Sequence, residues 1–151
     1  MASGESRWIS SSESRKDVHR LRARSSAILT GIGTVIADNP LLNARLEESD
    51  EIQQPDRIIL DSNLRSPATL KMAETSGRRV ILTGEGAPER QDLESFEIIR
   101  LPRTQEGQVD LVAAMDWLNQ EGYNEILIEA GPTLNGRLLE AHLVHEWIIY
   151  M

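Results

Sequence analysis

Cysteine is absent from this chain of 151 residues. That absence excludes disulfide bonds, thiolate-bound zinc and a cysteine nucleophile. The three histidines (His19, His142 and His145) fall on polar stretches of sequence, which favours surface positions over metal ligation. The sequence therefore predicts no metal site.

An excess of basic residues is also missing. The chain has 16 Lys and Arg against 24 Asp and Glu, a net charge of −8, which argues against a general binder of nucleic acid or of an anionic membrane. No apolar run approaches the roughly 20 residues that span a bilayer, and no signal peptide is expected at the start. A few local arginines could still hold the phosphate of a small ligand.

Aromatic residues are scarce at 4%, whereas 40% of the residues are hydrophobic, so we expect one globular domain with an aliphatic core. Short apolar runs predict strands, and helices or long crossovers separate them. This alternation predicts an α/β fold, a mainly parallel sheet with helices on both faces. The expected strands are 26–30, 57–62, 79–83, 97–101, 126–128 and 146–151; the expected helices run from the capping box Ser10–Glu13 to about Ala23, over 34–38, over 109–121, and onward from Gly131.

The stretch 126–137 organises the chain. Its apolar start predicts a buried strand, with Glu129 at the carboxyl end, where ligands bind in open α/β sheets. Gly131 and Pro132 then start a helix, whose free N–H groups from Thr133 onward form a potential phosphate site. An ordinary strand-to-helix connection would use the same glycine and proline.

A second glycine turn starts at Gly31 and leads into a helical turn that carries Thr34 and Asp38. Ser62 ends another predicted strand, where the ribose of an adenosine is often held. With Arg65 nearby, Ser62 would tolerate a 2′-phosphate, which favours NADP over NAD, although Asp61 could reverse that preference. Both the G-x-G-x-x-G fingerprint and the Walker A sequence are absent.

Arg22 lies four residues after Val18, on or beside the inward face of the first predicted helix. An inward guanidinium needs a partner, because a buried unpaired charge is costly. That partner could be a nearby Asp or Glu, or a ligand anion.

Six segments occur in an order that carries a family resemblance: SGESRWI, RARS, ILT, TVIADNPLL, ILDS and EAGPTL, at 3–9, 22–25, 28–30, 34–42, 59–62 and 129–134. In combination they resemble the reductase half of the bacterial bifunctional riboflavin biosynthesis deaminase/reductase. The resemblance covers the chain and implies a dihydrofolate-reductase-like, three-layer fold. It further implies a cytoplasmic, homodimeric enzyme that uses NADPH to reduce 5-amino-6-(5-phosphoribosylamino)uracil to the ribitylamino product.

Site residues follow from the resemblance by position. It implies that Ser6, Arg22, Leu42 and Arg45 hold the substrate, with the two arginines on its 5-phosphate, and that Glu129 faces the carbon that receives hydride. The residues implied for NADPH are Trp8, Thr34, Asp38, Ser62, Gly131, Pro132, Thr133, Leu134, Asn135, Gly136 and Arg137. A core position for Trp8, and helix capping for Thr34 and Asp38, are the structural alternatives.

Glu129 is the candidate catalytic residue. Desolvation at the end of an apolar strand would favour a protonated carboxyl that donates its proton. The family's reductase half extends beyond both ends of residues 1–151 and adjoins a deaminase domain, so we expect a partial domain with weak activity or none. A nucleotide- or phosphate-binding module without turnover is the competing interpretation, against which Glu129, Arg22 and Arg45 argue.

Overall fold

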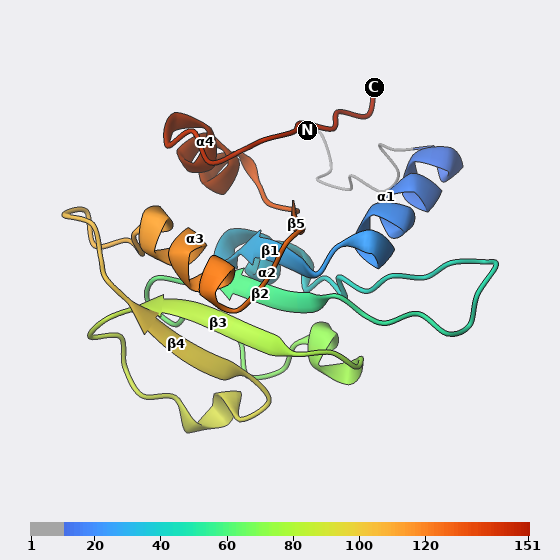
Figure 1. Ribbon diagram of the computed structural model, residues 1–151. Coiled ribbons are helices and arrows are strands. Elements are labelled where there is room, and N and C mark those ends of the chain that lie inside the picture. Colours follow the sequence, from blue (N-terminus) through green and yellow to red (C-terminus); the bar gives the residue numbers. More distant parts are fainter. Residues whose placement is uncertain (1–10) are drawn as a thin grey trace, which may run out of the picture.

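The computed structural model describes residues 11–151, which form a five-stranded sheet in the order β4-β3-β2-β1-β5 (Figure 1). All four pairs of neighbouring strands are parallel. The expected parallel sheet is therefore confirmed. Its strands are β1 (Ala27–Gly31), β2 (Asp56–Leu60), β3 (Arg79–Gly84), β4 (Glu97–Leu101) and β5 (Ile126–Ile128).

Helical segments cover both faces of the sheet. Helices α3 (Leu111–Gln120) and α4 (Pro132–Glu140) pack on one face through Leu118 and Leu138. The other face is covered by α2 (Ile32–Asp38) and by the 3-10 helices η1 (Lys71–Glu74) and η2 (Gln91–Leu93). Because both faces are covered, β1, β2 and β3 are buried along nearly their whole length. The result is a three-layer α/β fold, as expected.

Helix α1 (Ser12–Arg24) starts one residue later than the sequence suggested. Its N-cap is Ser11, whose Oγ accepts a hydrogen bond from the Ser14 N–H at 3.1 Å. The expected capping box from Ser10 to Glu13 is therefore wrong, because Ser11 offers its hydroxyl oxygen to the first turn instead. Ser10 lies outside the described residues.

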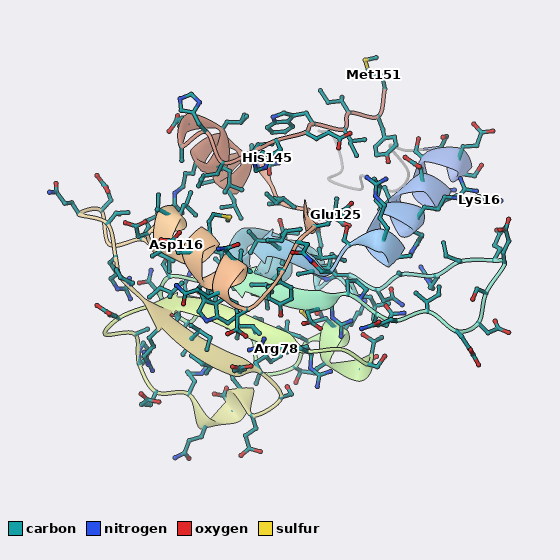
Figure 2. The ribbon with its side chains drawn as sticks, viewed as in Figure 1. Lys16, Arg78, Asp116, Glu125, His145 and Met151 are labelled. Atoms are coloured by element: carbon teal, nitrogen blue, oxygen red, sulfur yellow. The ribbon has the colours of Figure 1, made fainter. Side chains whose placement is uncertain are left out.

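β5 differs from the buried strand that its apolar residues suggested. It pairs with β1 alone and lies at one edge of the described sheet, so Ile126, Leu127 and Ile128 are only half-buried. The expected strand over 146–151 is also wrong, because this exposed tail pairs with no strand of residues 11–151. The tail runs from α4 to Met151 (Figure 2). The Tyr150 hydroxyl donates to Asp17 Oδ2 of α1 at 2.6 Å.

Helices α3 and α4, which cover the first face, differ in detail from the helices that the sequence suggests. α3 starts at Leu111, because the Asp110 carboxylate caps it by accepting from the Val112 and Ala113 N–H groups. Val112 is apolar but 57% exposed, and Ala114 is fully buried. On α4, Leu138 is fully buried whereas Leu139 is 44% exposed. One leucine of that adjacent pair therefore belongs to the core.

We predict that Leu138→Ala lowers the free energy of unfolding by about 2–5 kcal/mol, because it leaves a cavity between α4 and the sheet. Leu139→Ala, the matched control on the same helix, should change it by less than about 1 kcal/mol. Urea denaturation monitored by circular dichroism measures both. Equal losses for the two variants would contradict the observed orientation of α4.

Candidate functional site

The order in which strands are added to the sheet reverses at β1. From β1 the chain adds β2, β3 and β4 on one side, and it then returns through α3 to place β5 on the other side. Crevices at the carboxyl ends of strands flanking such a switch point are the usual ligand sites of open α/β sheets. Here Gly31 ends β1, and Gly131 lies just beyond β5.

A cavity of about 490 Å³ opens at this point. It lies between the first turns of α2 and α4 and the loop that follows β2. Eight of the residues implied for the cofactor line it: Thr34, Asp38, Ser62, Gly131, Pro132, Thr133, Leu134 and Arg137. The structure therefore brings together groups that are up to about 100 residues apart in the sequence, as a nucleotide site would require.

The two helix N-termini give the cavity its electrostatic character. The N-cap residues are Gly31 for α2 and Gly131 for α4, and neither supplies a side-chain cap. The first N–H groups of a helix have no acceptor within it and carry a partial positive charge, so they favour an anion. In α4 those groups belong to Thr133 and Leu134, since Pro132 has no N–H.

Gly131 contributes space rather than an unusual backbone conformation. Its φ of −75° and ψ of 179° suit any residue. A Cβ at this position would lie 3.8 Å from Thr34 Oγ1, an ordinary contact across the cavity. The missing side chain therefore leaves room for a ligand to approach the turn, and the fold itself does not depend on it.

The opposite wall is the loop after β2. Ser62 Oγ accepts from the Val109 N–H at 2.9 Å, and the exposed Arg65 lines the cavity. Asp61 is fully buried, and its Oδ2 accepts from both the N–H and the hydroxyl of Ser66, at 2.7 and 2.8 Å. The carboxylate that could have repelled a 2′-phosphate is therefore committed to Ser66 and does not line the cavity.

Asn63 and Gln108 also line the cavity but carried no signal in the sequence. Each lies in a loop whose place depends on distant contacts. Arg103 Nη1 donates to Asn63 Oδ1 at 3.1 Å, and Arg137 Nη2 donates to the Val109 carbonyl at 3.0 Å. Such pairings between remote loops cannot be read from local patterns.

Other implied cofactor residues lie elsewhere. Asn135 and Gly136 do not line the cavity, and Asn135 Nδ2 donates to the Ala130 carbonyl at 2.8 Å. They were expected there because they continue the glycine turn, but by then the helix has rotated them away. Trp8 and Ser6 lie outside the described residues.

Glu129 and Arg22 form a bidentate ion pair beside the cavity. Arg22 Nε and Nη2 donate to Glu129 Oε1 and Oε2 at 2.6 and 2.7 Å, and Nη1 donates to the Asn43 carbonyl at 3.2 Å. The side chains are 16% and 24% exposed. The inward arginine thus has the carboxylate partner that was one of its two alternatives. Glu129 faces a guanidinium instead of the apolar surroundings expected to favour its protonated form.

Arg45 and His19 extend this group. The Arg45 side chain is exposed, and its backbone N–H donates to His19 Nδ1 at 3.1 Å. Burial, followed by Arg22 and Arg45, lowers the pKa of His19 below 6.5. His19 is half-buried, so it is less exposed than its polar surroundings in the sequence suggested, whereas His142 and His145 are exposed. The position of His19 three residues before Arg22 was the signal available in the sequence, because residues at this spacing share a helix face.

The Leu42 side chain is buried in the core beside Val35 and Ile59, so only its backbone could face a ligand. Within residues 11–151, no cluster of three or more His, Cys, Asp or Glu side chains could hold a metal ion. The described helices include none long and apolar enough to cross a membrane.

Comparison with known proteins places this geometry in a family. The family model described as the RibD C-terminal domain matches residues 1–151. The chain belongs to this family. It is 40% identical to Riboflavin biosynthesis protein RibD of Escherichia coli (strain K12), with all of the chain and 43% of that protein covered. It is 34% identical to the 5-amino-6-(5-phosphoribosylamino)uracil reductase of Buchnera aphidicola, with all of the chain and 77% of that protein covered.

Solved structures agree with this assignment. RibD of Acinetobacter baumannii, form 1, superposes with a TM-score of 0.75 at 37% identity, over 95% of the chain and 39% of that structure. The Riboflavin Biosynthesis Reductase Rib7 of Saccharomyces cerevisiae superposes with a TM-score of 0.72 at 25% identity, over 88% and 61%. The expected dihydrofolate-reductase-like fold is confirmed. The chain spans less than half the length of the RibD proteins it matches.

We predict that Gly131→Ala weakens NADPH binding at least about tenfold, equivalent to about 1.4 kcal/mol, because the methyl group fills space beside the α4 N-terminus. The free energy of unfolding should change by less than about 1 kcal/mol, since the backbone there suits alanine. Calorimetric titration with NADPH and urea denaturation measure the two effects.

Gly136→Ala is the matched control, because it lies on the same helix, outside the cavity and with open space around it. It should bind NADPH as the unaltered chain does. Unchanged binding by Gly131→Ala would show that no ligand approaches the α4 turn.

Proposed function

We propose that this chain catalyses the NADPH-dependent reduction of 5-amino-6-(5-phosphoribosylamino)uracil to its ribitylamino product, in riboflavin biosynthesis. One observation carries the proposal. A cavity between two glycine-capped helix N-termini adjoins a bidentate Arg22–Glu129 pair, and only Ala130 separates Glu129 from Gly131. This arrangement would hold an anion-binding nucleotide site next to a polar substrate site. The names of the Buchnera and Escherichia relatives support the same reaction and pathway.

The cavity suits NADPH in its donor groups. The N–H groups at the starts of α2 and α4 would hold the pyrophosphate, as helix N-termini do in other nucleotide sites. Ser62 and Arg65 would meet the adenosine 2′-phosphate, and Thr34 and Asp38 provide polar groups on the α2 side. When bound, NADPH supplies the hydride.

Arg45 is the main candidate for the substrate's 5-phosphate, because its guanidinium is exposed beside the Arg22–Glu129 pair. Arg22 would contribute from the side that does not face Glu129, since a phosphate against the carboxylate would be repelled. Ser6 and the Leu42 backbone complete the proposed substrate contacts. A cytoplasmic homodimer, as the resemblance implies, belongs to the same proposal.

Glu129 has the chemistry to orient the sugar. A ribosylamine opens to an imine-like form before its C1 accepts hydride, so the site must hold that carbon and manage one proton. Each Glu129 carboxylate oxygen accepts one hydrogen bond from Arg22, and such an oxygen can accept a second one, which suits a ribose hydroxyl. Positioning of this kind supplies much of the rate when a cofactor carries the chemistry.

A non-catalytic NADP- or phosphate-binding module is the second candidate. It is favoured by the completeness of the Arg22–Glu129 pair, since two donated hydrogen bonds and a third to Asn43 give Arg22 a structural role without any substrate. In that case the cavity would bind the nucleotide, and the pair would only tie α1 to the end of β5.

Mixing the chain with NADPH and the phosphoribosylamino substrate separates the two candidates. We predict oxidation of NADPH, followed by absorbance, only when the substrate is present, and slower oxidation of NADH. Arg65→Gln should reduce the preference for NADPH over NADH, because the 2′-phosphate loses a cationic partner. NADPH binding without substrate-dependent oxidation, both in this chain and in a longer chain that extends it, would contradict the enzyme and support the module.

We predict that Glu129→Gln lowers turnover at saturating NADPH and substrate at least about 10²-fold if the carboxylate relays the proton, and mainly raises KM if it only orients the sugar. Glu129→Gln should also lower the free energy of unfolding by about 1–3 kcal/mol, and so should a substitution of Arg22, because a largely buried partner loses its counter-charge.

Arg22→Met is the matched variant, since it removes the guanidinium and leaves Glu129 intact. Unchanged turnover and unchanged KM for Glu129→Gln, at equal folded fraction, would remove Glu129 from the mechanism. An effect shared in full by Arg22→Met would show that the pair acts as a unit.

A further inference from the structure

His19 lies on α1 one turn before Arg22, and its ring is half-buried against the segment 43–45. Its Nδ1 accepts a hydrogen bond from the backbone N–H of Arg45 at 3.1 Å. An acceptor nitrogen must carry a lone pair, so the neutral ring has its proton on Nε2. The contact therefore exists only while Nδ1 is unprotonated.

Charged groups surround the ring from three parts of the chain. Arg22 comes from α1 itself, Arg45 and the Asn43 carbonyl from the segment after α2, and Glu129 from the end of β5. Burial first, and then the two guanidinium groups, lower the pKa of His19, while Glu129 and the Asn43 carbonyl act in the opposite direction. The ring is consequently neutral at neutral pH, as its contact with Arg45 requires.

We propose that His19 is a positioning residue that holds Arg45 in the substrate's phosphate site, and that protonation of its ring releases Arg45. The identity of the phosphate ligand rests on the proposed function, whereas the contact between His19 and Arg45 does not.

Protonation would change the segment at one point. The Arg45 N–H would lose its acceptor, and a third positive charge would appear beside Arg22 and Arg45. The Asn43 carbonyl, which would favour the protonated ring, already accepts from Arg22 Nη1. Ala44 stays fixed, because the Gln54 side chain donates to its carbonyl and accepts from its N–H at 2.9 and 2.8 Å. The release is therefore confined to Arg45.

The direction of the pH effect distinguishes positioning from simple charge attraction. A histidine that acts only through its charge would tighten anion binding as the pH falls. A histidine that positions Arg45 would weaken anion binding as the pH falls. Because the pKa of His19 is lowered in the fold, the unfolded chain binds more protons just below pH 6.5, so stability also falls on acidification through that window.

Sulfate is a suitable probe, since it stays a dianion from pH 5 to 8, and calorimetry measures its affinity. The unaltered chain should lose about three- to tenfold in affinity on acidification, the worth of one hydrogen bond. His19→Asn keeps an acceptor at the position of Nδ1, so its affinity should be near that of the unaltered chain and independent of pH. His19→Ala should bind weakly at every pH.

Tighter binding by the unaltered chain at low pH, or full affinity in His19→Ala, would overturn the proposal. A second readout needs no ligand. In NMR titrations the Arg45 amide proton and the His19 ring should share one midpoint, and the Arg45 amide should not titrate in His19→Asn. The exposed His142 and His145 serve as internal controls.

The two readouts also separate this proposal from the enzyme itself. Shared titration in a chain without reductase activity would refute the proposed function and leave the role of His19 intact. Independent titration of Arg45 and His19 would refute the role of His19 even in an active enzyme.

Discussion

The parallel pairing of β5 with β1 is the constraint on which the site depends. Leu29 lies opposite Ile128, and the Glu129 N–H donates to the Leu29 carbonyl at 3.0 Å. This register brings the turn after β1 beside the turn after β5, so that the starts of α2 and α4 face one cavity. It also places Glu129 next to Arg22, which lies in the last turn of α1. A shift of one residue would turn Glu129 to the opposite face of the sheet.

The positive charges that would bind the proposed ligands are confined to a few positions. The chain carries a net charge of −8, yet the proposed ligands are anions. The positive groups of the proposed sites are the helix N-termini and the exposed side chains of Arg45 and Arg65. Arg22 differs, because Glu129 neutralises it and both are largely buried. A pair of this kind gives a defined geometry more than net stability, since desolvation offsets most of its Coulomb energy.

Much of the fold followed from local pattern. β-branched runs identified the strands, and the glycine turns at Gly31 and Gly131 identified two walls of the cavity, because strand ends and helix starts have strong local signals. The inward position of Arg22 followed from helical spacing. Local pattern failed at positions whose burial depends on tertiary context. Val112 and Leu139 are apolar but face solvent, which periodicity over a short helix could not decide.

The remaining residues show the same limit. Asn63 and Gln108 reach the cavity from loops fixed by distant partners such as Arg103. His19 was assigned to the surface because its surroundings in sequence are polar, yet in the fold it is half-buried and accepts from the Arg45 N–H. The sequence could indicate the proposed anion site at the strand ends, because backbone N–H groups would form it. It could not identify groups whose role comes from a loop that folds back onto a helix.

The distance between the two proposed subsites is set by a single residue. Ala130 separates Glu129 from Gly131, and its carbonyl accepts from the Asn135 side chain, which fixes the turn from within α4. Asn135 therefore shapes the site from outside the cavity. Because Glu129 is anchored to β1 by its N–H and to α1 by its carboxylate, neither subsite can move far without the other. The proposed hydride transfer requires its donor and acceptor at contact distance, and this short, doubly anchored connection would keep the two subsites close together through the backbone.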